Sequence, residues 1–429
     1  MEYMSVKEAA EKWRISERYV QRYCATERIE GAVKFGCSWA IPLDAEKPAD
    51  MRQRAAVQKA ANQKMGNPDT INQKTEKRRV LKKNMPPQKL HTAMPLLNTS
   101  WPPGKAMDFI PKMEDADTRQ IALAEYYYFS GQSAKASDIA EEYLPHEDLA
   151  LRLSACWLYA YANLALDRIP RARQAMAQVQ ATVKSIDENT PAIYRTYAAC
   201  IAVGACVLLH LPVPETLPPL RECIPLLPPG LRLFFLYVQA HQAYLAGQYG
   251  VCIGIAETAL ALEDTLYPVP TIYLHLVSTM GHINLKQGEQ AEEHLLEAWK
   301  IARPDDLLEA FGEHHGLLGG TLEAVLRKDY PDDFKRIIDI TYNFSAGWRK
   351  IHNPDTGQHV TDALTTMEFT VAMLAARGWT NQEISDHLGI RISTVKWYIS
   401  IILDKLYIKK ERAAAAVYAP VDWFCPLLF

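Results

Sequence analysis

Hydrophobic positions recur at three- and four-residue spacing along most of the chain, which is the pattern of amphipathic helices. Between about residues 106 and 345 such helices, built on Ala, Leu and Tyr, follow one another with few strand signals. The same spacing returns over residues 364–419, and it marks two shorter helices between residues 5 and 25. The pattern predicts a mainly α-helical protein.

Alternation of apolar and polar residues, the period expected of β-strands, is clearest near the N-terminus. Residues 32–35 and 38–41 alternate on either side of a short turn. Two helices precede them, and Ser5 and Ser16 are placed to cap the N-termini of these helices. We therefore expect a compact domain over residues 1–44, made of two helices and a small β-hairpin.

Three segments lack a regular pattern. Residues 45–105 are rich in Lys, Arg, Gln, Asn, Met and Pro, which is the composition of a basic, flexible linker. Residues 346–363 are expected to form a second linker, between the helical middle and the last helical segment. Residues 420–429 form an apolar tail.

The helices of the middle segment come in pairs. Gly131 and Gly247 stand at small-residue turns that follow one amphipathic helix and precede another. This layout resembles tetratricopeptide-type repeats, although Gly247 and Gly288 are 41 residues apart and the period of that repeat is about 34. The resemblance implies a helical-repeat-like domain over residues 106–345, whose concave face suits a small ligand, a peptide or a protein.

Charge is distributed unevenly along the chain. The formal net charge is −3, yet residues 1–105 hold 20 basic against 11 acidic side chains. Residues 106–363 hold 20 against 33, and residues 364–419 hold 7 against 5. Basic ends and an acidic middle suit a protein whose ends approach nucleic-acid phosphates.

Patterns of catalysis and metal binding are absent from the sequence. The eight cysteines include no CxxC pair, and no Cys/His cluster has zinc spacing. No phosphate-binding loop, HExxH, GxSxG or paired-carboxylate arrangement occurs, and we interpret the isolated pair His314-His315 as structural. A phospho-acceptor domain would show strands alternating with helices, and the sequence before residue 364 has no such pattern. We therefore expect no phospho-acceptor domain. We expect no enzyme activity, no cofactor and no metal.

Membrane and export signals are also missing. The first residues carry acidic side chains and lack the basic and then apolar layout of a signal peptide. The most apolar stretch, residues 198–211, is shorter than the roughly 20 residues that span a bilayer. We therefore expect a cytoplasmic protein without a membrane segment.

The C-terminal helical segment carries strong helix-boundary signals. Two Thr-x-x-Glu capping boxes begin at Thr365 and Thr380, and Gly378 and Gly389 are placed to end the helices that these boxes start. Ser393 is expected to cap a third helix that runs to about residue 407. A short helix, a tight turn and a longer helix form the layout of a helix-turn-helix.

The third of these helices is expected to read DNA. Its apolar stripe, formed by Val395, Ile399, Ile402 and Leu406, would face the core. The residues left to meet a DNA groove are Thr394, Lys396, Trp397, Ser400 and Lys405.

Three short runs in this segment resemble the LuxR-type DNA-binding domain: Asn381-Gln382-Glu383-Ile384, Thr394-Val395-Lys396 and Ile402-Leu403-Asp404-Lys405-Leu406. The resemblance implies a four-helix module over residues 364–419, with a recognition helix in the major groove and a last helix, about residues 409–419, available for dimerisation. It also implies that Lys396, Trp397 and Ser400 face base edges and nearby phosphates and that Thr394 contacts the backbone. Asp404 stands where a basic residue is frequent and would repel phosphate, so we expect modest affinity.

The N-terminal domain resembles the excisionase and MerR-like winged helix-turn-helix through Ser5–Ala10, Ile15–Arg22 and Ala32–Gly36. The resemblance implies that Arg18, Gln21 and Arg22 lie on the exposed face of the second helix and that Lys34 belongs to the wing. Two alternatives remain open for this domain, DNA binding and a role in protein interaction.

Together these observations predict a bacterial, one-component, sequence-specific transcription regulator. The helical middle would sense a small molecule or a protein partner, and the chain would act as a homodimer on double-stranded DNA. The alternative is a helical-repeat adaptor whose terminal helix-turn-helix modules have little affinity for DNA.

Overall fold

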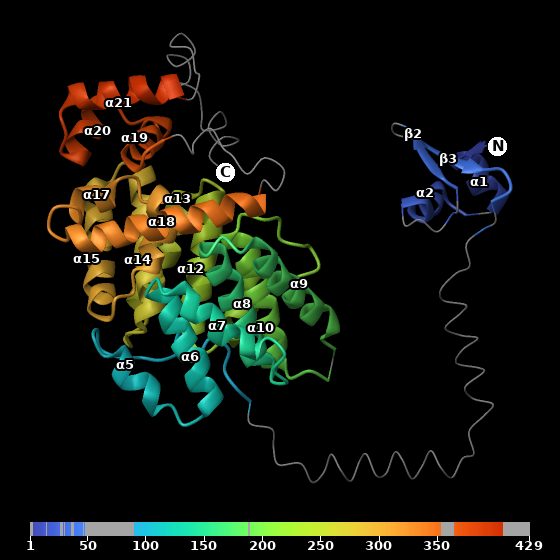
Figure 1. Ribbon diagram of the computed structural model, residues 1–429, viewed down its shortest axis with the longest axis horizontal. Coiled ribbons are helices and arrows are strands. Elements are labelled where there is room, and N and C mark those ends of the chain that lie inside the picture. The colour runs from blue at the N-terminus through green and yellow to red at the C-terminus, as the bar shows by residue number, and fades with distance from the viewer. Residues whose placement is uncertain are drawn as a thin grey trace. The chain divides into compact units, whose positions relative to one another are not determined.

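The computed structural model describes residues 3–13, 15–25, 29, 31–35, 38–45, 47, 90–187, 189–352 and 364–405 (Figure 1). The chain separates into two compact units, Met1–Lys89 and Leu90–Phe429, and each is described by itself. Both contain helices, and the chain is mainly helical as the hydrophobic pattern predicts. No helix within the described ranges is long and apolar enough to cross a membrane.

The first unit combines two helices with a small antiparallel sheet. Its elements are β1 (Tyr3–Ser5), α1 (Val6–Trp13), α2 (Glu17–Ala25), β2 (Val33–Phe35) and β3 (Ser38–Pro42). The sheet order is β1-β3-β2, with Met4 opposite Ile41 and Lys34 opposite Trp39. The hairpin of β2 and β3 lies where the alternating pattern predicts it. The edge strand β1 was not predicted, because a strand of three residues is too short to show an alternating pattern.

Local capping and a small core hold this first unit together. The Ser5 backbone N–H and hydroxyl both donate to Glu8 Oε2, at 2.7 and 2.9 Å, which fixes the start of α1 as expected from Ser5. Val20 from α2 and Ile41 from β3 are fully buried, and Trp13 packs in the same cluster. The helices thus cover one face of the sheet through a core of few residues.

The second unit begins with a helical body. Its helices are α5 (Ala106–Phe109), α6 (Ala116–Phe129), α7 (Ser133–Tyr143), α8 (Leu149–Ala165), α9 (Ile169–Ser185), α10 (Ala192–Leu208), α11 (Leu220–Cys223), α12 (Pro229–Leu245), α13 (Tyr249–Leu262), α14 (Pro268–Asn284), α15 (Gly288–Ala302), α16 (Glu309–His314), α17 (Thr321–Val325) and α18 (Pro331–His352), with short 3-10 turns that include η4 (His315–Leu317). The most extensive helix contacts join α14 to α15, α8 to α9 and α7 to α8.

One turn geometry recurs throughout this body. A single residue with positive φ follows α6, α8, α10, α12 and α14, and these residues are Gly131, Asp167, His210, Gly247 and Lys286. The turn that follows Gly247 in the series is therefore at Lys286, whereas Gly288 is the first residue of α15. Because only two of the five positions are glycine, spacing between glycines does not reveal the recurrence.

Residues 90–101 pack into the body, whereas their composition predicts a flexible linker over residues 45–105. Leu96, Leu97 and Trp101 are at most 2% exposed. The fully buried Glu125 of α6 accepts hydrogen bonds from the backbone N–H groups of Leu96 and Leu97, at 2.9 and 3.1 Å. The buried carboxylate satisfies two backbone donors that no helix or sheet would satisfy. The prediction for residues 48–89 lies outside the described residues.

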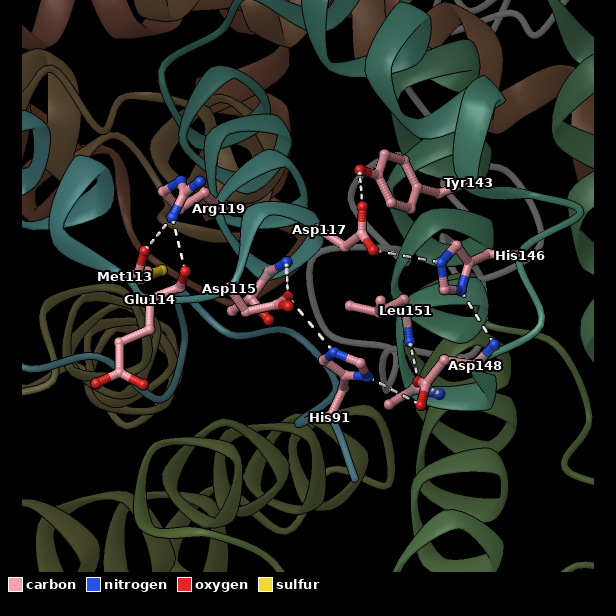
Figure 2. A network of polar contacts seen from close by, with 12 residues as sticks. His91, Met113, Glu114, Asp115, Asp117, Arg119, Tyr143, His146, Asp148 and Leu151 are labelled. Atoms are coloured by element: carbon pink, nitrogen blue, oxygen red, sulfur yellow. Dashed lines mark hydrogen bonds and ion pairs between the residues drawn. The ribbon is translucent and has the colours of Figure 1, made fainter. Parts of the chain in front are cut away.

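A network of polar side chains fixes the start of this packed segment (Figure 2). His91 lies between Asp115 and Asp148, 3.4 Å from one carboxylate and 3.0 Å from the other. Asp148 also caps α8 by accepting the N–H groups of its first turn and receives the hydroxyl of Tyr194. Burial opposes ionisation of Asp148, but the hydrogen bonds from Tyr194 and His91 outweigh it and lower the pKa of this carboxyl.

The last helix of the body, α18, is 22 residues long and ends at His352. It therefore includes the first seven positions of the predicted linker 346–363, and the structure describes nothing between residues 353 and 363. Gly347 lies against the Leu164 carbonyl, where an added Cβ would stand 2.0 Å from the oxygen. This close approach and the packing of Trp348 and Ile351 against the core of the body hold the last turns of α18 on α8.

Candidate nucleic-acid interface

Three helices follow the body: α19 (Thr366–Ala376), α20 (Asn381–Leu388) and α21 (Ile392–Lys405). Both expected capping boxes form. The Thr365 N–H donates to Glu368 Oε2 at 2.6 Å, and the Thr380 N–H donates to Glu383 Oε2 at 2.6 Å, while each threonine hydroxyl accepts the return bond. These bonds satisfy backbone donors that a helix start leaves free, so local sequence alone fixes where α19 and α20 begin.

The ends of α19 and α20 lie just before the two glycines that were predicted to stop them. Gly378 and Gly389 have φ of 76° and 61°, the left-handed conformation that glycine adopts without a steric penalty. The start of α21 differs from the prediction, because the Arg391 carbonyl accepts from Thr394 and Val395. Ser393 therefore lies within the first turn of α21, one position after Ile392, and is not its N-cap.

A compact apolar core holds the three helices together. Val395 and Ile402 of α21 are buried as expected, and Ile399 is partly buried against the same cluster. The other buried members of this cluster are Ile283, Ala291, Leu364, Val371, Ala372, Leu374, Trp379 and Ile384. Ile283 and Ala291 come from the helical body, so the core of this domain continues into α14 and α15. Leu406, the fourth residue of the predicted stripe, is outside the described residues.

The outer face of α21 carries most of the predicted DNA-reading residues. Lys396 is exposed, and Trp397 is 57% exposed, which is unusual for the largest apolar side chain. Ser400 lies one turn further on at half-burial, and Thr394 is also half-buried. Since residues three and four positions apart share a helix face, Lys396, Trp397 and Ser400 form one surface. Asp404, which stands where the family often has a basic residue, is exposed and lies one turn beyond Ser400.

Lys405 has a different environment from these residues. Its ammonium donates to Glu368 Oε2 at 2.7 Å, so it links the end of α21 to the start of α19. Glu368 is 5% exposed; burial opposes its ionisation, but Lys405 and the Thr365 N–H outweigh burial and lower the pKa of Glu368. This geometry assigns Lys405 to the fold of the domain.

Figure 1 shows α19 and α20 between α21 and the helical body. Polar contacts join these helices to the body at its left-handed turn after α14. Lys286 Nζ donates to the Gly378 carbonyl at 2.9 Å and pairs with Glu383 Oε1 at 3.1 Å. The residue that takes the strained turn conformation therefore also contacts the capping box of α20.

Further contacts connect the C-terminal helices to α12, to α17 and to the segment between α16 and α17. Arg377 donates to the Leu317 carbonyl and to the Tyr244 hydroxyl, both at 3.2 Å. Thr370 donates to Glu323 Oε1 at 3.3 Å, and His387 Nε2 lies 3.1 Å from the Gly319 carbonyl. The three-helix domain is thus held on its inner side and leaves the outer face of α21 exposed.

Glycines permit the closest approaches in this contact region. An added Cβ at Gly316 would stand 2.8 Å from the Phe369 ring, and one at Gly320 would stand 2.6 Å from Leu388 and Thr370. Gly319 and Gly320 also have φ of 58° and 85°. The sequence signal for this interface is the run His315-Gly316-Leu317-Leu318-Gly319-Gly320, which hydrophobic periodicity does not reveal.

The N-terminal candidates are located less completely. Arg18, Gln21 and Arg22 belong to α2 and Lys34 to β2, as expected. Gln21 is exposed. The side chains of Arg18, Arg22 and Lys34 lie outside the part of the chain that the structure describes, as do the predicted fourth helix over residues 409–419 and the apolar tail.

One group of side chains within the described ranges could hold a metal ion: Glu257 of α13, His282 of α14 and His294 of α15. The Nε2 atoms of His282 and His294 lie 3.0 and 3.4 Å from Glu257 Oε1. Gln287 Oε1 holds His282 Nδ1 at 2.7 Å. The sequence predicts no metal site, because these three residues lie on separate helices and form no motif by spacing.

Comparisons with known proteins concern the C-terminal segment. The chain is 47% identical over 58 residues to the transcriptional regulatory protein LiaR of Bacillus subtilis, covering 14% of this chain and 27% of LiaR. It is 41% identical over 112 residues to the response regulator protein VraR of Staphylococcus saprophyticus, covering 25% of this chain and 53% of that protein. The chain thus spans about half the length of one relative and about a quarter of the other. No solved structure matches. Residues 362–419 match the model of the luxR family of bacterial regulatory proteins, and with the geometry above they are a helix-turn-helix domain of that family.

Proposed function

We propose that this chain is a sequence-specific, DNA-binding transcriptional regulator of one-component type. The observation that carries the proposal is the outer face of α21, where Lys396 and the 57%-exposed Trp397 stand on the third helix of a luxR-type domain. A lysine can bind a guanine edge or a phosphate, and an indole can pack against a thymine methyl group or a sugar. Neither side chain stabilises the core of the domain.

The N-terminal unit would be a second DNA reader. Its helix, helix and hairpin order is that of a winged helix-turn-helix, with α2 as the reading helix and the β2–β3 hairpin as the wing. Interaction with a protein is the alternative for this unit. Residues 45–89, with their excess of basic side chains, would add attraction to DNA that does not depend on sequence.

The helical body would act as the sensor, in the cytoplasm, and its pairs of helices would serve as tetratricopeptide-like repeats. Contacts on α19 and α20 leave the reading face of α21 exposed, so the body can influence DNA binding by holding the domain in one orientation. Two chains would bind as a homodimer, because the resemblance to luxR-type domains implies a last helix, over about residues 409–419, that is available for dimerisation. A protein partner of the body is an alternative to a small-molecule effector.

The test begins with selection of duplexes from a random pool by the full-length chain. Affinity for a selected duplex is then compared with that for a scrambled duplex at two stated salt concentrations. We expect Lys396→Ala and Trp397→Ala each to weaken binding to the selected duplex by about 10- to 100-fold. Lys328→Ala, which removes an exposed cation from the helical body, is the matched control and should leave affinity unchanged.

The adaptor alternative predicts a different set of results. The full-length chain would then enrich no sequence from the pool and would bind selected and scrambled duplexes equally. Equal affinity of Lys396→Ala and the unchanged chain for an enriched site would contradict the role given to α21, and binding would then have to come from the N-terminal unit. The same measurement with Gln21→Ala, an exposed α2 variant, identifies that case.

A further inference from the structure

A cavity of about 270 Å³ lies inside the helical body and reaches the DNA-binding domain. Its walls come from α6, α8, α10, α12, α14, α16, η4 and α18, and Leu364 and Phe369 of the C-terminal domain also line it. Pockets for small molecules usually measure about 300–1,000 Å³, so this cavity suits a small ligand. Its position between the body and α19 is where a bound molecule could contact both.

Aromatic rings form most of the wall. Trp157 and Tyr161 stack with ring centroids 4.8 Å apart and an interplanar angle of 22°, and Phe344 stacks with Tyr161 at 6.5 Å and 13°. Tyr237 and Tyr273 form a further tilted pair with centroids 4.9 Å apart. Faces of such rings carry partial negative charge and attract cations, most strongly where water is excluded.

Glu313 supplies the formal charge of this cavity. It is the lone carboxylate among the described lining residues, and none of them is a lysine or an arginine. The hydroxyl of Tyr273 donates to Glu313 Oε2 at 2.7 Å, and the hydroxyl of Tyr128 donates to Glu313 Oε1. Two phenol donors hold this carboxylate in place, yet no positive side chain in the lining neutralises it. An anion inside an aromatic box without its own cation is complementary to a cationic ligand.

Two further lining residues present polar atoms without a partner. Tyr161 is 4% exposed, and its hydroxyl makes no hydrogen bond within the described structure. His241 is 3% exposed, and neither of its ring nitrogens has a hydrogen-bond partner there. Burial lowers the pKa of His241 well below its ordinary value, so the ring is neutral and offers one donor and one acceptor. Unsatisfied buried groups of this kind are costly in a core and indicate a polar occupant.

We propose that this cavity binds a small organic cation, with an ammonium group beside Glu313 and an apolar or aromatic body packed against the aromatic wall. We further propose that this ligand is the effector of the regulator, a part of the proposal that rests on the function proposed above. Burial raises the pKa of Glu313 to about 7, against the opposing effect of its two tyrosine donors, and an adjacent cation would keep the carboxylate ionised.

The route from this cavity to the DNA-binding domain is short. Phe369 of α19 lines the cavity directly and touches Gly316 of η4. The neighbouring His315 pairs with Glu323 at 2.8 Å, and Glu323 also accepts from Thr370 of α19. A ligand that packs against Phe369 therefore favours one arrangement of α19 on the body over others, which is the differential contact that coupling between two sites requires.

The binding test uses the full-length chain and isothermal titration calorimetry with three probes of nearly equal size: 2-phenylethylammonium, 2-phenylethanol and phenylacetate. We expect the cation to bind at least about tenfold more tightly than the neutral alcohol and the anion not to bind, because an ionic hydrogen bond is stronger than a neutral one. This comparison needs no variant and so does not depend on how a substitution folds. Equal binding of the cation and the alcohol, preference for the anion, or absence of binding by the cation up to about 10 mM would overturn the proposal.

Variants then locate the site. Glu313→Gln keeps the shape of the side chain but removes its charge, because the amide oxygen still accepts from one tyrosine hydroxyl and the amide nitrogen donates to the oxygen of the other. The preference for the cation over the alcohol should therefore disappear while thermal unfolding shows an intact body. Glu297→Gln, which alters an exposed carboxylate on α15, is the matched control and should keep the preference. A cation preference that survives Glu313→Gln would place the ligand elsewhere and overturn the assignment.

The effector role has its own readout. Saturating 2-phenylethylammonium should change the affinity of the unchanged chain for its selected duplex at least about fivefold and leave Glu313→Gln unaffected. A probe that binds without changing an established DNA affinity would overturn the effector role alone. Failure to bind any duplex would contradict the proposed function, whereas the calorimetric result for the cavity would stand independently.

Discussion

The helical body and the C-terminal domain set the ends of their helices by different means. In the C-terminal domain, α19 and α20 each begin with a Thr-x-x-Glu capping box and end before a glycine in the left-handed conformation. In the body, Asp115 and Asp148 cap α6 and α8, but no side-chain cap holds α9, α10, or α12 to α15. Three of the five recurring turns place Asp167, His210 or Lys286 in a conformation that costs an L-residue about 1–2 kcal/mol.

This difference follows from the amount of surface that each region buries. The C-terminal domain has a core of few side chains, so individual backbone hydrogen bonds at helix ends matter to it. The body buries a large apolar cluster that runs through most of its helices, and helices in such a core are stabilised by packing more than by local signals. Packing can therefore hold an unfavourable turn residue in place.

The largest expected effect tests packing in the body. At Gly230 of α12 an added Cβ would stand 1.9 Å from the Leu97 carbonyl oxygen, and at Gly254 of α13 it would meet nothing within 4 Å. We expect Gly230→Ala to lower the free energy of unfolding by about 3 kcal/mol or more, because backbone must move. Gly254→Ala should instead stabilise the chain by up to about 1 kcal/mol, since alanine favours helix. Chemical denaturation monitored by circular dichroism measures both.

The matched pair makes the result decisive, because both substitutions add the same methyl group to a helix of the body. Similar effects of the two alanines would mean that backbone contact between α12 and residues 96–98 does not stabilise the fold. The packed segment 90–101 would then behave as the linker that its composition suggests.

Sequence patterns predicted the C-terminal domain far better than the body for the same reason. Thr365, Thr380, Gly378 and Gly389 act within one turn of their own position, so a reader of the sequence can recognise their role. Lys396 and Trp397 lie on the expected exposed face, since helix periodicity places them opposite Val395. Even there, the start of α21 was predicted two residues too late, because Arg391 and not Ser393 precedes the first turn of the helix.

What the sequence could not show depends on contacts between distant residues. Trp101 bonds to Asp305 across 204 positions, and this contact makes a Pro-rich segment part of the core. Glu313 lies next to His314, which sequence analysis interpreted as structural, and becomes a cavity carboxylate through Tyr128 and Tyr273. Lys405 is a basic residue on the predicted DNA-reading helix, but its ammonium donates to Glu368. No local pattern encodes such pairings.

An intermediate effect tests local stabilisation in the C-terminal domain. Glu368 accepts both the Thr365 N–H and the Lys405 ammonium, and its pKa is lowered in the folded state. Glu368→Gln should therefore lower the free energy of unfolding by about 1–2 kcal/mol at neutral pH, where the carboxylate is ionised. Glu297→Gln, at an exposed pair on α15, should change it by less than about 0.5 kcal/mol.

The pH dependence of this difference has a defined sign. A carboxyl whose pKa falls on folding stabilises the fold above its unfolded value and loses that contribution as pH drops through the lowered folded value. The gap between Glu368→Gln and the unchanged chain should therefore be widest at neutral pH and should close progressively below about pH 4.5. If the difference in free energy of unfolding stayed constant on acidification, the effect would come from packing. The C-terminal domain would then depend on packing in the same way as the body.

The smallest expected effect concerns Lys286, the residue that belongs to both regions. It takes the left-handed turn after α14 and pairs with Glu383 at the start of α20, with both side chains about 40% exposed. An exposed pair contributes little, so Lys286→Ala should lower the free energy of unfolding by no more than about 0.5 kcal/mol. Lys286→Gly removes the same pair but relieves the turn, and should be as stable as the unchanged chain or more so. Hydrogen exchange should nevertheless report faster opening of α20 in both variants and unchanged protection of α14, because the lost contact joins the domain to the body. Faster exchange in α14 instead would mean that the lysine stabilises the turn itself, and the two regions would then share one cooperative unit.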